Sequence, residues 1–230
     1  ELDNESWVFY PPNAKGAERY ADHVYRIALA MKRLDPSIQL TACGLGQPDW
    51  DRPLLERLAP LVDFVALHRY VGEDDEEYRH VLGTSRTFEH MIDQAESVID
   101  DAVKGQRLGK KIGIAFNEYN IMRDWSAGQG PSDHRFELTF NLRDAIWLAT
   151  ILNLFQRRGD VVKFGNYSIL VNAVAPIRTN DTGLFLQTVF HTMRLYSQHC
   201  GNQWLGAKVR TRTFPTKIVP PGLGNRAVPD

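Results

Sequence analysis

Two asparagine–glutamate pairs carry the side chains best suited to chemistry in this chain. Asn4-Glu5 lies near the first residue, and Asn117-Glu118 follows an apolar run. Two carboxylates that face each other can hydrolyse a glycosidic bond, with retention when they are about 5 to 5.5 Å apart and with inversion at about 6.5 to 9.5 Å. Taken alone, each pair also fits a helix cap or a surface ion pair.

A third polar group follows another apolar run, at His68-Arg69-Tyr70. His68 is compatible with a hydrogen-bonded core or loop histidine as well as with a catalytic one, and Arg69 with a tie to an acidic loop. A zinc site is not predicted, because no second His or Cys lies at ligand spacing and the HEXXH motif is absent.

The elements that must position these residues alternate between two patterns. Apolar runs without polar alternation predict buried strands, and apolar residues spaced three and four apart predict helices. Strands are expected at residues 38–43, 63–67, 111–120 and 161–171, and helices at residues 17–34, 53–61, 88–102, 136–156 and 185–200. The expected inward faces are Tyr20, Val24, Ile27, Met31 and Leu34; Phe88, Ile92, Ala95, Ile99 and Ala102; Leu142, Ile146, Ala149 and Leu152; and Val189, Phe190, Met193 and Tyr196.

Continuous alternation of strand and helix predicts an α/β fold with parallel strands. Strand ends near Glu5, Cys43, Leu67, Phe116 and Phe164, each followed by a helix, suit the later half of an eight-stranded (β/α)8 TIM barrel. A doubly wound open sheet is the competing arrangement, although neither GxGxxG nor GxxxxGK[ST] follows any expected strand. In either fold the polar residues at the carboxyl ends of the strands meet at one edge.

Composition limits the choice of partner. The 230 residues include 43% hydrophobic residues, and 27 basic residues balance 28 acidic ones. This is the balance of an ordinary soluble globular protein, without the basic face expected of a nucleic-acid-binding domain. We expect a neutral or weakly charged ligand, no membrane segment, and free thiols at Cys43 and Cys200.

The sequence pattern at the two ends of the chain predicts that the chain is part of a larger folded unit. The pattern predicts a partial barrel, followed by a tail with strand alternation from Trp204 to Ile218 that is the first strand of another unit. An open half-barrel exposes strand edges, so we expect association with a missing portion of the chain or a homo-oligomer. A Gly/Pro/Ser loop at residues 126–132 is expected to form a wall or lid, and the acidic stretch at residues 73–77 a solvated loop.

Five stretches together resemble a known family. They are DNESW at 3–7, MKRLDPSIQLTACG at 31–44, VALHRY at 65–70, FNEYN at 116–120 and LVNAVAPIRT at 170–179. These are similar to the catalytic barrel of α-L-arabinofuranosidases of glycoside hydrolase family 51, with interruptions, up to about residue 201. The resemblance implies a partial (β/α)8 catalytic domain over residues 1–201. It also implies a linker and the first strand of a truncated β-sandwich domain over residues 202–230.

The resemblance implies a role for each candidate residue. Glu5 matches the general acid/base and Glu118 the nucleophile. Asn4 matches an asparagine that binds a sugar hydroxyl, while His68 and Tyr70 match a pair that orients the site, with Tyr70 hydrogen-bonded to the nucleophile. Asn117 precedes the nucleophile and is expected to bind substrate.

The chain departs from the family near these residues. Asp3 replaces a glycine, and Ile121-Met122-Arg123 replaces Val-Trp-Tyr, which leaves Trp125 as the nearest aromatic residue. A substrate-binding glutamine of the family falls on Ile169.

The resemblance implies a retaining enzyme without cofactors that releases terminal α-L-arabinofuranosyl residues from arabinan or arabinoxylan. β-Xylosidase or endoglucanase activity, or a non-catalytic fragment that needs its missing half, are the alternatives. Because no signal peptide is visible at the start of the chain, a cytoplasmic location is favoured.

Overall fold

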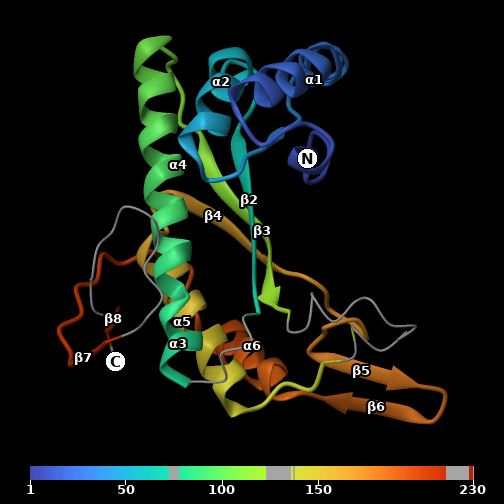
Figure 1. Ribbon diagram of the computed structural model, residues 1–230, viewed down its shortest axis with the longest axis vertical. Coiled ribbons are helices and arrows are strands. Elements are labelled where there is room, and N and C mark those ends of the chain that lie inside the picture. Colours follow the sequence, from blue (N-terminus) through green and yellow to red (C-terminus); the bar gives the residue numbers. More distant parts are fainter. Residues whose placement is uncertain (73–77, 123–135, 137, 216–227, 230) are drawn as a thin grey trace. The chain divides into compact units, whose positions relative to one another are not determined.

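The computed structural model describes residues 1–72, 78–122, 136, 138–215 and 228–229 (Figure 1). The expected acidic loop at 73–77 and the expected lid at 126–132 lie outside these residues, as does Trp125. The elements in chain order are η1 (Ser6–Val8), α1 (Ala14–Leu34), β1 (Thr41–Cys43), α2 (Pro48–Leu58), β2 (Phe64–Val71), α3 (Tyr78–Gly83), α4 (Ser85–Gly105), β3 (Gly113–Ile121), α5 (Leu142–Arg157), β4 (Val162–Tyr167), β5 (Ile177–Asn180), β6 (Gly183–Leu186), α6 (Thr188–His199), β7 (Thr213–Phe214) and β8 (Val228–Pro229).

The main sheet of the described residues has the strand order β1-β2-β3-β4. β1 pairs with β2 in parallel, and Leu2 forms a single parallel bridge to Ala42 of β1. Parallel pairing of β2 with β3 follows from two hydrogen bonds near opposite ends of the strands, Gly113 N to Asp63 O and Met122 N to Val71 O. The predicted α/β class with a parallel sheet is confirmed, whereas closure into an eight-stranded barrel stays a prediction.

The chain divides into two compact units, which are described separately. Unit 1 comprises residues 1–68, 91–117 and 161–164, and unit 2 comprises residues 69–90, 118–160 and 165–230. The sequence analysis instead predicted one boundary near residue 201, between a catalytic domain and a β-sandwich. That boundary does not coincide with the division into units and stays a prediction.

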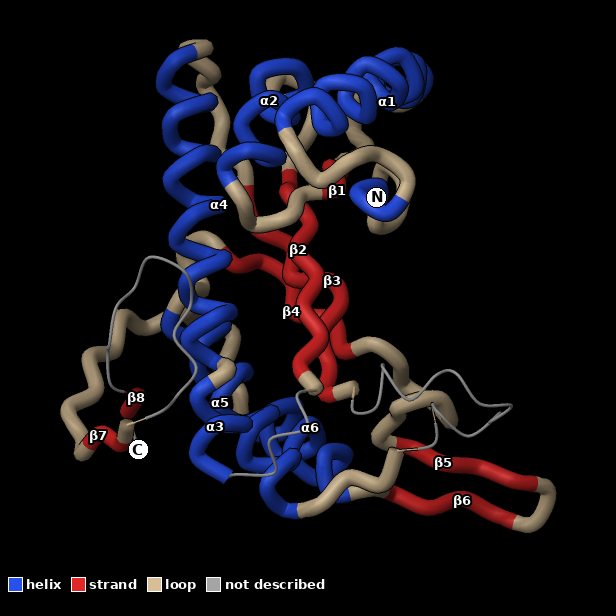
Figure 2. Tube along the Cα trace, in the orientation of Figure 1, coloured by secondary structure: helices blue, strands red, loops and turns tan. Residues whose placement is uncertain are grey.

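In unit 1, α1 and α2 lie side by side (Figures 1 and 2). Tyr20 of α1 stacks on Trp50 of α2 with the ring centroids 5.9 Å apart. The predicted inward face of α1 is correct at Tyr20 and Val24 but wrong for its last three residues, which are exposed: Ile27, Met31 and Leu34. Since α2 has 11 residues and α1 has 21, α2 covers only part of the apolar stripe.

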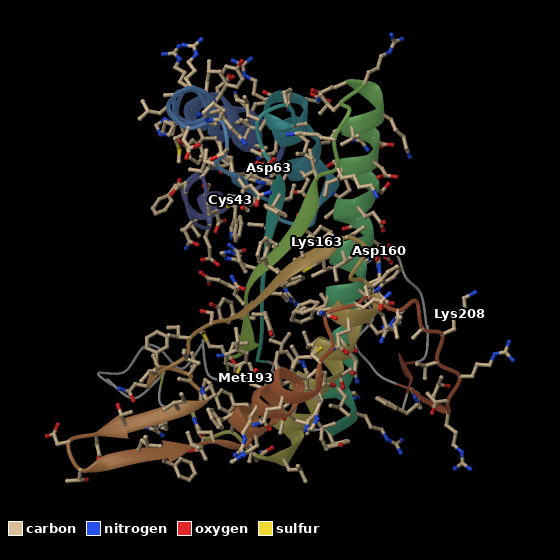
Figure 3. The ribbon with its side chains drawn as sticks, turned by 180° about the vertical axis from the view of Figure 1, so that it is seen from behind. Cys43, Asp63, Asp160, Lys163, Met193 and Lys208 are labelled. Atoms are coloured by element: carbon tan, nitrogen blue, oxygen red, sulfur yellow. The ribbon has the colours of Figure 1, made fainter. Side chains whose placement is uncertain are left out.

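Asp63, labelled in Figure 3, fixes the start of β2 in unit 1. Its carboxylate accepts hydrogen bonds from Lys32 Nζ of α1 at 3.0 Å and from the backbone N–H of Leu40 at 2.9 Å. The half-buried carboxylate of Asp63 therefore connects α1 and the segment before β1 to β2, the strand that contains His68.

Unit 2 is built around aromatic side chains. Phe88 of α4 packs edge to face against Tyr119 of β3 and Trp147 of α5, at centroid distances of 6.4 and 6.0 Å. The N-terminus of α5 carries a capping box, in which Asn141 Oδ1 accepts from Asp144 N and the Asp144 carboxylate accepts from Asn141 N.

The start and the inward face predicted for the helix at 136–156 are wrong. It begins at Leu142, behind the Asn141 cap, and Leu142 and Ile146 are exposed. The buried apolar residues are Ala145, Trp147, Leu148, Ile151, Leu154 and Phe155. Because α5 is apolar on several sides, periodicity alone does not select the buried side, and the aromatic core of unit 2 does.

A hairpin that the sequence analysis missed occupies β5 and β6. Asn180 Oδ1 accepts from the backbone N–H groups of Thr182 and Gly183, both at 3.0 Å, and thereby closes a two-residue turn. Phe185, expected in a helix, instead pairs with Arg178 in this hairpin. The last helix accordingly begins at Thr188.

Strands β2 and β3 run further than predicted. The strand ends were expected near Leu67 and Phe116, but β2 continues to Val71 and β3 to Ile121. His68, Tyr70 and Glu118 therefore lie within strands and not beyond them. In the tail, the described residues 202–212 are not in a strand, and β7 covers only Thr213–Phe214. Among the described residues, no helix combines the length and apolar character needed to cross a bilayer.

Candidate active site

Glu5 of unit 1 lies on a tight, strained turn. Its φ is 48° and that of Asp3 is 70°, both in the left-handed region that non-glycine residues rarely adopt. The buried Ser6 holds the turn, since its N–H donates to Cys43 Sγ at 3.3 Å and its hydroxyl to Asp3 Oδ2 at 3.0 Å. Strain of this kind persists where the surrounding structure fixes it, and it concentrates at functional sites.

Tyr20 anchors the segment that precedes Glu5. Its hydroxyl donates to the carbonyl of Leu2 and accepts from the backbone N–H of Cys43 at 3.1 Å. Burial raises the pKa of the Tyr20 hydroxyl, which therefore remains a donor over the whole neutral range. The first residues of the chain are thus fixed beside β1.

His68 is the partner of Glu5 within unit 1. Its Nδ1 lies 3.1 Å from Glu5 Oε1, its Nε2 lies 3.9 Å from Glu1 Oε1, and Trp7 packs edge to face on the ring at 5.5 Å. The His68 side chain is 2% exposed, whereas the Glu5 side chain is 34% exposed. Imidazole and carboxylate are also metal ligands, but at 3.1 Å these two are in hydrogen-bond contact with each other.

The two asparagines predicted to bind substrate also belong to unit 1. Asn117 Nδ2 donates to Glu1 Oε2 at 2.5 Å, and among the described residues its buried Oδ1 accepts no hydrogen bond. Asn4 is exposed, and its backbone N–H donates to Asp3 Oδ1 at 2.9 Å. Asn117 therefore offers an acceptor atom, and Asn4 a solvent-facing amide.

In unit 2, the hydroxyl of Tyr70 donates to Glu118 Oε2 at 2.6 Å. This is the contact that the family resemblance predicted for these two residues. Both side chains are half-buried and come from neighbouring strands, Tyr70 from β2 and Glu118 from β3. The Tyr70 hydroxyl also lies 2.8 Å from Ser168 Oγ.

Ser168 was missed by the sequence analysis, although it is the first residue after β4. Asn120 lies in the FNEYN stretch but was not among the candidate site residues. In the structure Asn120 is 0% exposed and bonds the carbonyl of Ser168 through Nδ2 at 2.6 Å. The available signal for Ser168 was its position, a hydroxyl shortly after the strand end expected near Phe164.

Comparison with known proteins supports the resemblance. A family model described as the α-L-arabinofuranosidase C-terminal domain matches residues 117–221. An intracellular exo-α-(1→5)-L-arabinofuranosidase of Halalkalibacterium halodurans is 26% identical over 94% of this chain and 46% of its own length. One from Bacillus subtilis is 29% identical over 77% of this chain and 38% of its own length.

This chain is a relative of the family 51 α-L-arabinofuranosidases. Solved structures agree with this relationship. One is an α-L-arabinofuranosidase from Thermotoga maritima in complex with arabinose, which matches with a TM-score of 0.77 and 26% identity. The match covers 93% of this chain and 42% of that enzyme. A family 51 enzyme from Bifidobacterium longum shares the fold with a TM-score of 0.80 and 22% identity, over 93% of this chain and 46% of its own. The chain thus spans less than half the length of the relatives that it matches.

Proposed function

We propose that the protein acts as a retaining glycoside hydrolase that releases terminal α-L-arabinofuranosyl residues, with Glu118 as nucleophile and Glu5 as acid/base. The observation that carries the proposal is the 2.6 Å hydrogen bond from Tyr70 to Glu118 Oε2. A phenol that donates to one carboxylate oxygen fixes the carboxylate in one orientation, which an in-line attack on a sugar carbon requires. The names of the relatives supply the sugar.

In the first step, ionised Glu118 attacks the anomeric carbon and protonated Glu5 gives its proton to the departing glycosidic oxygen. The glycosidic C–O bond breaks as the bond from the anomeric carbon to Glu118 forms. In the second step, Glu5 removes a proton from water, the water oxygen attacks the same carbon, and Glu118 leaves as a carboxylate. Both residues then have their starting protonation states.

His68 suits the work of Glu5. Because Nδ1 lies 3.1 Å from Glu5 Oε1, the imidazole can donate to the carboxylate or accept from the carboxylic acid, depending on its tautomer. It can therefore hold Glu5 in place through both steps. The buried Oδ1 of Asn117 can accept a hydrogen bond from a sugar hydroxyl, and the exposed amide of Asn4 can make a second contact.

The test replaces each acid separately. Glu118→Ala and Glu5→Ala should lower kcat/KM on arabino-oligosaccharides by about 10³-fold or more. On a nitrophenyl arabinofuranoside, whose leaving group needs no acid, azide should restore turnover in both variants. The product should be an inverted glycosyl azide with Glu118→Ala, where azide replaces the nucleophile, and a retained one with Glu5→Ala, where it replaces the water. Glu18→Ala, an exposed change in α1, is the control.

Wild-type activity in either acid variant would overturn the assignment. Because the chain spans less than half the length of its relatives, the assay should be paired with intact mass and size-exclusion chromatography. We propose that the active species contains either further copies of this chain or a covalent or associated remainder of the barrel, and that it is intracellular like the named relatives.

The sugar itself needs a separate test. Ile169 stands where the family has a substrate-binding glutamine, and it is 50% exposed. An isoleucine there cannot hydrogen-bond a sugar hydroxyl. A panel of nitrophenyl glycosides separates arabinofuranosidase activity from the alternatives, β-xylosidase and endoglucanase, and the largest kcat/KM on the arabinofuranoside is the expected result.

A further inference from the structure

The Tyr70 hydroxyl lies within hydrogen-bond distance of two oxygen atoms. Glu118 Oε2 is 2.6 Å away and Ser168 Oγ is 2.8 Å away. A phenol has one proton to donate, and an ionised carboxylate can only accept. If Tyr70 donates to Glu118, the hydroxyl of Ser168 must donate to the phenolic oxygen, so a chain of two hydrogen bonds runs from Ser168 through Tyr70 to Glu118.

The backbone of Ser168 is tied to the strand that carries Glu118. Its N–H donates to the carbonyl of Tyr119 at 3.3 Å, and its own carbonyl accepts from Asn120 Nδ2 at 2.6 Å. Both bonds lead to β3, within two residues of Glu118. Ser168 is consequently held in register with the carboxylate.

Asn120 makes this attachment rigid. Besides the bond to Ser168, its Nδ2 donates to the carbonyl of Val174 at 2.7 Å. Its Oδ1 accepts from the Ile121 N–H at 2.7 Å and from the Tyr167 hydroxyl at 2.5 Å. Both amide protons and both acceptor positions of this buried side chain are therefore used. A fully satisfied buried amide has one favoured orientation, because any rotation breaks several bonds at once.

We propose that Ser168 is a positioning residue for the nucleophile: it sets the direction of the Tyr70 hydroxyl, and Asn120 holds it there. The inference rests on the proposed function of Glu118. A phenolic O–H lies in the ring plane and can point to either side, and a donor bound to its oxygen selects one side. With Ser168 in place, the proton of Tyr70 points to Glu118 before substrate binds, so no reorganisation is needed during the reaction.

The test is a double-mutant cycle on kcat. Ser168→Ala should lower kcat about 5-fold, the rate equivalent of one neutral hydrogen bond, with little change in KM. Tyr70→Phe should lower kcat by about 10- to 100-fold. Since Ser168 acts through Tyr70, adding Ser168→Ala to Tyr70→Phe should cause no further loss. Additive effects of the two substitutions would overturn the proposal.

A second measurement reads the contact without turnover. The measurement is carbon NMR on protein whose tyrosines are isotopically labelled at Cζ. The signal of Tyr70 is identified by its absence from Tyr70→Phe. It should shift in Ser168→Ala and stay unchanged in Thr150→Ala. Thr150 is the matched control because its hydroxyl donates only within α5, to the Ile146 carbonyl at 3.0 Å. An unmoved Tyr70 signal in Ser168→Ala would refute the contact.

The two proposals fail in different ways. Unchanged activity in Glu118→Ala would overturn the proposed function, and this inference with it. Activity that is lost in Glu118→Ala but unchanged in Ser168→Ala would overturn the positioning role alone.

Discussion

The two candidate acids have contrasting surroundings. Glu5 of unit 1 lies on a left-handed turn in front of a 3-10 helix, and its partner is the imidazole of His68. Glu118 of unit 2 lies inside the nine-residue strand β3, and its partner is the phenol of Tyr70. An imidazole nitrogen can donate or accept a hydrogen bond, depending on the tautomer, whereas the phenol of Tyr70 donates to the carboxylate.

This difference matches the two roles. An acid/base must change its protonation state in each step, and a partner that adapts by changing its own role allows this without breaking contact. A nucleophile must keep one orientation and one charge, which a donor of fixed character on a regular strand provides. The surroundings therefore favour Glu5 for proton transfer and Glu118 for attack.

The largest expected effect tests this division through the leaving group. Glu5→Ala should lower kcat/KM by about 10³-fold on an arabino-oligosaccharide but less than about 10-fold on a nitrophenyl arabinofuranoside, because nitrophenolate leaves without help from an acid. Glu118→Ala should lower kcat/KM on both substrates alike, since no bond to the sugar can form without the nucleophile. Initial rates on the two substrates give the comparison. Reversed sensitivities would mean that the two roles are exchanged.

The next effect concerns how each unit holds its strands. Asn120→Ala removes four hydrogen bonds from a buried position in unit 2 and should lower the free energy of unfolding by about 2 to 4 kcal/mol. Asp63→Ala removes two half-buried contacts in unit 1 and should cost about 1 to 2 kcal/mol. Chemical denaturation measures both. An equal or larger loss for Asp63→Ala would contradict this order.

Two buried aspartates in first helical turns extend the comparison. Asp144 of α5 accepts from Asn141 N and Arg143 Nε through its two oxygens. Asp51 of α2 accepts from Leu45 N at 2.8 Å through Oδ1, while its Oδ2 is buried and, among the described residues, has no hydrogen-bond partner. Burial raises the pKa of Asp51 to about 7, against a partial opposing effect of backbone N–H groups.

The last predicted effect follows from this pKa. Because the folded-state pKa lies above the unfolded one, the folded protein keeps a proton that the unfolded chain releases from about pH 4 upward. Stability is therefore lost as the pH rises from about 4 to about 7. Asp51→Asn stays neutral, so its stability relative to wild type should grow by roughly 2 kcal/mol between pH 5 and pH 8. Thermal unfolding at both pH values measures this gain.

Asp101→Asn is the control for that measurement, since Asp101 is exposed and pairs with Arg52 at the surface. Its stability relative to wild type should change little between the two pH values. A pH-independent difference between Asp51→Asn and wild type would show that Asp51 does not titrate in this window.

The sequence by itself determined the alternation of elements and the candidate acids. Unpatterned apolar runs such as 63–67 predict buried strands, because only parallel strands covered on both faces tolerate them. The Asp35-Pro36 pair marks the expected end of the helix at residue 34 by local chemistry, which needs no tertiary contact. The motifs around Glu5 and Glu118 indicated the family for the same reason: they are continuous in the chain.

Only the tertiary structure decided which side of α5 is buried, where β2 and β3 end, and which residues meet the acids. Trp147 packs against Phe88 of α4, and Phe88 in turn packs against Tyr119 of β3, so this aromatic core joins elements that lie far apart in the chain. Ser168 reaches Tyr70 across 98 positions of sequence, and no local pattern encodes such a contact. Residue spacing specifies what a short segment can form, whereas the partner of each side chain depends on how separate segments pack together.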